Sequence, residues 1–185
     1  MKFKGFLAIG LVLLLSGCKD EKLHEALNQY VVFDDAYQLT LHFQNQSGYD
    51  DSIQLNPVDI NLTILNSNQS IDQTMIEQLH EELKQLTKSN IAKLQHTLVG
   101  IDQANATKID DVSGNMLFVL SVKQDNQEML YVGLNDSKDL KIVNGKLRVN
   151  IILSDSDFKK LYESFQQIVT DRSAFFGKYS DKVPM

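Results

Sequence analysis

Two stretches in the N-terminal half alternate between hydrophobic and polar residues with a period of two. In residues 37–44 the apolar positions are Tyr37, Leu39, Leu41 and Phe43; in residues 58–64 they are Val58, Ile60, Leu62 and Ile64. This period is typical of a strand with one buried face. We therefore predict a strand in each stretch. Residues 45–52, which include Gly48 and the pair Asp50-Asp51, are predicted to form a polar turn after the first strand.

Other stretches have hydrophobic residues at helical spacing. Residues 20–32 are predicted to form a first helix on this basis. The longest periodic segment follows Ser70 and Gln73, a capping-box pair, and ends near Gly100. Thr87 and Asn90 lie near its middle, where polar side chains compete for backbone hydrogen bonds. One long helix and two shorter pieces both remain open, and the average helix length favours two. The apolar stripe comprises Met75, Ile76, Leu79, Leu83, Leu86, Ile91, Leu94 and Leu98.

The C-terminal half reads as a meander of four strands. After a polar loop at residues 102–115, strands are predicted at 116–122 and 129–134, with turns at 125–128 and 136–138. Asn144-Gly145 predicts a two-residue hairpin turn, which would pair Ile142 with Leu147 and Leu140 with Val149 and place Lys141 opposite Arg148. The predicted inward face is Leu140, Ile142, Leu147, Val149, Ile151 and Leu153.

A last amphipathic helix is predicted from the cap Ser154 to about Phe176, with Gly177 ending it and a loose tail to Met185. Phe175, Phe176 and Tyr179 are expected to pack on the sheet. Taken together, the elements predict an α+β domain: an antiparallel sheet of about six strands with a long helix and N- and C-terminal helices packed on it, the helices on one face.

The N-terminus has a different pattern. Lys2 and Lys4 precede an almost unbroken apolar run at residues 6–15, which is too short to span a bilayer but has the length of a secretory leader. Leu15-Ser16-Gly17-Cys18 closes the run and resembles the lipobox of bacterial lipoproteins. That resemblance implies cleavage before Cys18, lipidation of Cys18 and an outer-membrane location facing the periplasm, because Lys19 rather than Asp follows the cysteine. In a cell with a single membrane, the anchor would lie in the cell membrane.

Composition and net charge limit the kinds of partner that the protein is expected to bind. Residues 1–17 form the predicted signal peptide and residues 18–185 a single mature domain, whose formal charge is about −8 compared with −6 for the whole chain. A negative domain disfavours nucleic acid and anionic lipid headgroups as partners. Cys18 is the single cysteine, so the mature domain has no disulfide and depends on its hydrophobic core.

Candidate catalytic and metal-binding groups are scattered. The four histidines, His24, His42, His80 and His96, include no pair at metal-binding spacing, and we interpret them as solvated surface residues. The paired carboxylates are Asp34-Asp35, Asp50-Asp51, Glu81-Glu82, Asp110-Asp111 and Asp155/Asp157. They fall in turns and helix starts and do not match a calcium loop. We predict no catalytic residues, no metal and no cofactor.

These observations predict a non-enzymatic, membrane-anchored envelope lipoprotein that binds another envelope protein, as an assembly or secretion accessory or as an immunity protein. The alternative is a lipoprotein that binds a small ligand, either a lipid or a peptide, between the sheet and the long helix. An enclosed apolar cavity would favour the ligand binder, whereas a protruding helix would favour the protein binder. The long helix is expected to belong mainly to the core, and the exposed side of residues 77–95 is the expected contact surface for a partner.

Overall fold

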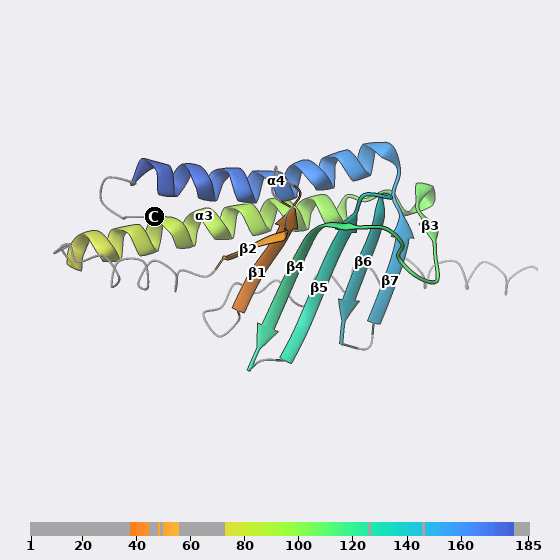
Figure 1. Cartoon of the computed structure of the whole chain (residues 1–185), viewed down its shortest axis with the longest axis horizontal. Helices are drawn as coiled ribbons and strands as arrows, with labels where there is room; N and C mark the ends of the chain where they lie inside the picture. The colour runs from red at the N-terminus through yellow and green to blue at the C-terminus, as the bar shows by residue number, and fades with distance from the viewer. Residues whose placement is uncertain are drawn as a thin grey trace, which may run out of the picture.

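The computed structural model describes residues 38–44, 48, 50–55, 73–125, 127–145 and 147–179. Its main feature is one antiparallel sheet of seven strands in the order β2-β1-β4-β5-β6-β7-β3 (Figure 1). The strands are β1 Gln38–Gln44, β2 Asp50–Gln54, β3 Thr107–Lys108, β4 Met116–Gln124, β5 Gln127–Asn135, β6 Asp139–Asn144 and β7 Leu147–Ile152. Two helices, α3 Gln73–Val99 and α4 Asp155–Lys178, and a short 3₁₀ turn at Gln103–Asn105 complete the described elements. The predicted α+β class is therefore confirmed, with seven strands where about six were expected.

The meander β4 to β7 and strand β1 lie where the sequence predicted them. The predicted polar turn at residues 45–52 is partly wrong, because Asp50–Gln54 forms β2 and pairs with β1. Most of its side chains are exposed at the edge of the sheet, so this strand needs no hydrophobic alternation. The predicted loop at 102–115 also contains the two-residue strand β3. The predicted helix at 20–32, the predicted strand at 58–64 and the leader lie outside the described residues.

Alternate residues of the strands form a continuous hydrophobic face. Cross-strand neighbours Leu41, Leu120, Val132 and Ile142 make one row of this face, and all four are buried. The opposite face carries Thr40, Lys123, Tyr131, Lys141 and Arg148, which are half-buried or exposed. The period of two therefore separates a core face from a polar face, as the sequence pattern predicts.

The register of the β6–β7 hairpin differs from the prediction. Asn144 pairs with Leu147 and Val143 with Arg148, so the two-residue turn is at positions 145–146 rather than 144–145. Gly145 adopts a positive φ of 55°, a conformation that glycine takes without steric cost. Lys141 consequently lies opposite Asn150 instead of Arg148. The shift moves each pairing by two residues, so the inward face keeps Leu140, Ile142, Val149, Ile151 and Leu153.

The long helix is a single element. α3 runs for 27 residues without a break, about 40 Å at 1.5 Å per residue. Thr87 and Asn90, which suggested a break, are buried in its middle. The Thr87 hydroxyl donates a 3.1 Å hydrogen bond to the carbonyl oxygen of Leu55, just after β2. A tertiary contact thus satisfies the Thr87 hydroxyl, while the Asn90 oxygen, in the same polar stretch, is buried without a hydrogen-bond partner.

The last helix begins as predicted and ends later. Ser154 is its N-cap: the hydroxyl accepts a 3.1 Å hydrogen bond from the Asp157 amide and donates one of 2.9 Å to the Asp157 carboxylate. Gly177 was predicted to end the helix, but α4 continues to Lys178 with Tyr179 as its C-cap. Gly177 has no positive φ in this structure, so it does not supply the left-handed residue of a glycine cap.

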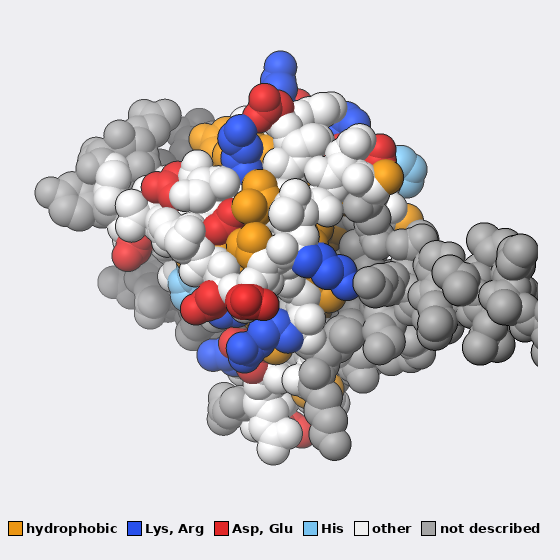
Figure 2. Space-filling view, turned by 90° about the vertical axis from the view of Figure 1, so that its right-hand side faces the viewer, with side chains coloured by type: hydrophobic (Ala, Val, Ile, Leu, Met, Phe, Trp, Pro, Cys, Tyr) orange, Lys and Arg blue, Asp and Glu red, His pale blue; other side chains and the backbone are white. Residues whose placement is uncertain are grey.

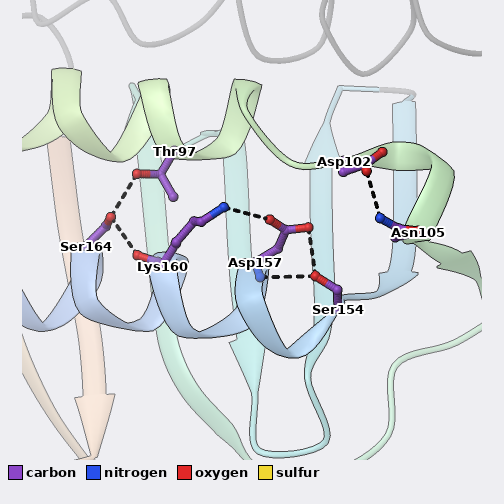
Figure 3. Close-up of polar contacts among 7 residues, drawn as sticks. All are labelled: Thr97, Asp102, Asn105, Ser154, Asp157, Lys160 and Ser164. Carbon is purple, nitrogen blue, oxygen red and sulfur yellow. Dashed lines mark hydrogen bonds and ion pairs between the residues drawn. The ribbon is translucent and has the colours of Figure 1, made fainter.

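α3 and α4 run antiparallel, side by side, on one face of the sheet (Figures 1 and 3). The C-terminal half of α3 and the N-terminal half of α4 complete the main core through Ile91, Leu94, Leu98, Leu161 and Phe165. The other halves extend past the side of the sheet formed by β2 and β1 as a two-helix projection (Figure 1). We call this projection the arm and define it as residues 73–86 of α3 and 172–179 at the end of α4.

The arm has its own small hydrophobic cluster. Leu79 and Leu83 of α3 are buried there, and the half-buried side chains Met75, Ile76, Leu86, Phe175, Phe176 and Tyr179 pack against them. The C-terminal aromatic residues therefore pack on the long helix and not on the sheet as expected. The long helix therefore packs into the main core along its C-terminal half and projects beyond the sheet along its N-terminal half.

Candidate functional site

Several predicted site residues lie outside the described part of the chain. Cys18, His24 and Asp34-Asp35 belong to this group, so lipidation of Cys18 stays a prediction. Neither described helix combines the length and hydropathy needed to cross a bilayer.

The remaining histidines are not brought together with other candidate ligands. His42 is exposed on β1, and His80 and His96 lie on α3, in the arm and near the helix end respectively. Across the described residues, no three His, Cys, Asp or Glu side chains are placed to share a metal ion.

The buried carboxylate of Asp139 has a structural role. Asp139, 3% exposed at the start of β6, accepts hydrogen bonds from the Ser113 amide at 3.0 Å and from Asn135 Nδ2 at 3.1 Å. Asn135 is fully buried, also donates to the Ser113 carbonyl oxygen, and accepts a 2.7 Å bond from the Asp139 amide. These bonds attach the loop before β4 to the β5–β6 turn. The paired carboxylates Asp110 and Asp111 lie exposed in this same loop. Asp111 Oδ1 accepts a 2.9 Å hydrogen bond from the Val112 amide.

Polar side chains of both described helices come together between α3 and α4. A groove of about 590 Å³ follows the outer side of the α3–α4 seam from Asn90 to Gly100. We call it the seam groove. Lys93 and His96 of α3 and Lys160 and Glu163 of α4 form its exposed rim.

The floor of the seam groove is made of small polar side chains. The hydroxyls of Thr97 and Ser164 lie 2.9 Å apart across the helices (Figure 3). Each oxygen is also within hydrogen-bond distance of the carbonyl oxygen four residues earlier in its own helix, at 3.0 Å for Thr97 and 2.9 Å for Ser164. Two hydroxyl hydrogens cannot serve three donations, so the pair shares its protons and keeps free acceptor lone pairs. Asn90 also lines the groove; it is 4% exposed, and its Oδ1 has no hydrogen-bond partner.

A second, more open groove lies on the arm. It has a volume of about 750 Å³ and is lined by Gln78, Glu81, Glu82, Gln85, Leu86 and Phe175. Two carboxylates therefore flank two half-buried apolar side chains. We call it the arm groove.

Contacts with the end of α4 hold the Glu82 carboxylate of the arm groove in place. The Tyr179 hydroxyl donates a 2.5 Å hydrogen bond to Glu82 Oε2, and Lys178 Nζ lies 3.5 Å from the same oxygen. The bond from Tyr179 is the main cause that lowers the pKa of Glu82, with the charge of Lys178 adding to it. The pKa of Lys178 is raised, first through its hydrogen bond with Tyr179 and then through the charge of Glu82.

Charges of both signs also occur at the opposite end of the molecule. The view onto this end shows Lys, Arg, Asp and Glu side chains interspersed, with hydrophobic side chains in small patches (Figure 2). Lys138 Nζ lies 2.5 Å from the carboxylate of Asp155 at the start of α4, and this hydrogen bond lowers the pKa of Asp155.

The fold and its grooves define a class: an α+β domain in which an antiparallel helix pair covers one face of an antiparallel sheet and extends past its edge. No family model matches the sequence, and neither characterised proteins nor solved structures show a significant similarity to it. The assignment of function therefore rests on the chain itself.

Proposed function

We propose that this protein is a lipid-anchored envelope protein that binds another envelope protein and has no enzymatic activity. The observation that carries the proposal is the arm. Its helices extend beyond the sheet and are held together by a separate hydrophobic cluster around Leu79 and Leu83. The main core closes around other residues, so the arm adds accessible surface that the sheet does not need for burial.

The arm groove supports a protein partner of defined chemistry. Glu81 and Glu82 supply negative charge beside the half-buried Leu86 and Phe175. A partner surface with basic residues around an apolar side chain would complement this arrangement. The acidic chain as a whole, at −6, would increase the association rate of such a partner.

The alternative is a lipoprotein that binds a small ligand, either a lipid or a peptide, between the sheet and the long helix, and the two grooves formed by the described residues give less support to its lipid form. A carrier needs an enclosed pocket lined mainly by apolar side chains. The seam groove and the arm groove are open and lined mostly by polar residues.

Anchoring at Cys18 remains part of the proposal and follows from the lipobox resemblance. Two or more acyl chains on one cysteine would hold the domain stably at a membrane, with the outer membrane, facing the periplasm, expected from Lys19. Fractionation of cells that express Cys18→Ala tests this step. Loss of the membrane-bound mature form is expected, and a mutant that is processed and retained like the wild type would contradict it.

Site-specific photo-crosslinking in intact cells tests partner binding. A photoreactive residue at Gln78, exposed on the arm, should give a discrete adduct, whereas one at the exposed Arg148 on the polar face of the sheet should not. The charge reversal Glu81→Lys should weaken the Gln78 adduct. Failure to trap any protein from Gln78, or equal trapping from both positions, would refute the proposed contact surface.

A further inference from the structure

We infer that the seam groove binds an acidic peptide segment in extended conformation. This site is separate from the arm groove and needs neither the arm nor the lipid anchor for its chemistry. The inference rests on three features of the groove, which are its rim charges, its floor and its length.

The rim carries an excess of positive charge in an acidic chain. Lys93, His96 and Lys160 face one carboxylate, Glu163, which lies 3.9 Å from Lys159 of its own helix. Lys93 forms no ion pair with the described residues, and Lys160 lies 3.5 Å from Asp157. Lys93 is exposed and can turn towards a ligand carboxylate. The side chain of Lys160 is exposed as well, while its partner Asp157 is buried and also accepts a hydrogen bond from the Ser154 hydroxyl.

The floor offers acceptors rather than donors. The Thr97 and Ser164 oxygens have spare lone pairs, and the buried Asn90 oxygen has no donor. This oxygen is enclosed and lacks a partner, which is unfavourable, so a ligand donor would be favoured once the carboxamide turns its oxygen to the groove. Rotation about the broad terminal torsion of Asn90 can turn its carboxamide to meet such a donor.

This combination selects the ligand class. A peptide brings N–H groups for the acceptors of the floor and, if acidic, carboxylates for the cations of the rim. A simple anion without a proton, such as sulfate, supplies charge for the rim but no donor for the floor. A neutral or basic peptide supplies donors but does not complement the rim.

The length of the groove limits the segment. Asn90 and Gly100 are ten residues apart on α3, about 15 Å at 1.5 Å per residue. An extended chain rises about 3.3 Å per residue, so about four or five residues would fill the groove.

Fluorescence anisotropy with the full-length chain in nonionic detergent tests the inference. The probes are labelled pentapeptides of sequence Gly-Glu-Glu-Glu-Gly, Gly-Gln-Gln-Gln-Gly and Gly-Lys-Lys-Lys-Gly. We expect the glutamate peptide to bind at least about tenfold more tightly than the other two, with an affinity that falls as salt rises. Thr97→Val, which removes one floor acceptor at nearly constant volume, should weaken binding several-fold.

Charge reversal locates the site. Lys93→Glu combined with Lys160→Glu should reduce affinity for the glutamate peptide at least about tenfold. The matched control, Lys123→Glu with Arg148→Glu at exposed positions on the polar face of the sheet, changes the net charge equally and should reduce it less than about threefold. Circular dichroism and urea midpoints verify that all variants fold.

The remaining outcomes count against the inference. Absence of binding by any peptide overturns it, as does equal binding of the glutamine peptide or equal loss in the control. Displacement of the peptide by inorganic phosphate at equal concentration would show a simple anion site instead. None of these results depends on the Gln78 crosslink, so a failure here leaves the proposed role of the arm untouched.

Discussion

The hydroxyl of Tyr179 and the carboxylate of Glu82 are joined by a 2.5 Å hydrogen bond, although 97 positions separate them in the sequence. The bond connects the end of α4 to the first half of α3 at the surface of the arm. It favours the ionised form of Glu82 in the folded protein.

This bond should make the arm sensitive to acid. Because the pKa of Glu82 is lowered on folding, its contribution to stability is fully present above the ordinary value of 4.5 and disappears as the pH falls through the lowered folded pKa. Tyr179→Phe should move the titration of Glu82, followed by NMR of its side-chain carboxyl, to higher pH. Tyr162→Phe is the control, since Tyr162 contacts Phe118 and Phe158 in another part of the molecule. An unchanged titration in Tyr179→Phe would show that the bond does not control Glu82.

The two hydrophobic clusters should respond differently to truncation. Leu94→Ala removes a buried side chain from the main core and should lower the free energy of unfolding by about 2–5 kcal/mol. Leu83→Ala acts on the smaller cluster of the arm, so a loss near the low end of that range is expected. Native-state hydrogen exchange should show that Leu83→Ala reduces protection mainly in residues 73–86, while Leu94→Ala reduces it throughout. Uniform loss of protection in both variants would mean that the arm does not open separately.

Two glycines should respond oppositely to replacement by alanine. Gly114 has φ +104°, and a Cβ there would lie 2.4 Å from Asp136 Oδ1, so Gly114→Ala should cost about 1–3 kcal/mol. Gly177 lies inside α4 with open space around it, so Gly177→Ala should stabilise by up to about 1 kcal/mol. Urea denaturation of the two variants measures both effects, and a stabilised Gly114→Ala would contradict the strain argument.

Asp139 should matter for folding rather than for a reaction. Asp139→Ala leaves the Ser113 amide and the Asn135 side chain without their buried acceptor, and should cost about 1–3 kcal/mol. Asp110→Ala, an exposed carboxylate in the same loop, should change stability by less than about 0.5 kcal/mol. Thermal or urea unfolding compares the two. Similar values would show that the buried network contributes little.

Sequence periodicity predicted the strands and the helix that have one buried face and one exposed face. The meander and α4 follow from alternation and from the cap at Ser154, which the structure confirms. β2 was missed because Asp50, Asp51 and Ser52 resemble a turn, whereas an edge strand needs only backbone pairing. α3 is continuous through the polar stretch at its middle, where Thr87 bonds to Leu55 and several residues are buried, and local propensity contains none of these tertiary contacts.

The seam groove was not predicted, although a signal for it exists. The polar positions Asn90, Lys93, Thr97 and Gly100 recur at helical spacing beside the apolar stripe of α3, and Lys160, Ser164 and Gln167 do so on α4. Each set alone resembles an ordinary solvated helix face. Only the antiparallel packing of α3 against α4 brings the two polar stripes together, and nothing in either stripe specifies that packing.

The placement of the two shortest strands has a consequence for self-association. Among the described strands, β2, with five residues, and β3, with two, form the two edges of the sheet, while the long apolar strands β4 and β5 lie inside it. Exposed edges template intermolecular strand pairing, which leads to fibrillar aggregates. Asp50 and Asp51 place charge on the β2 edge, and at the other edge β3 covers Ile151 and Ile152 while the Ile109 amide donates to the Asn150 carbonyl oxygen. These features should limit strand pairing between molecules at both described edges, although no disulfide holds the sheet together.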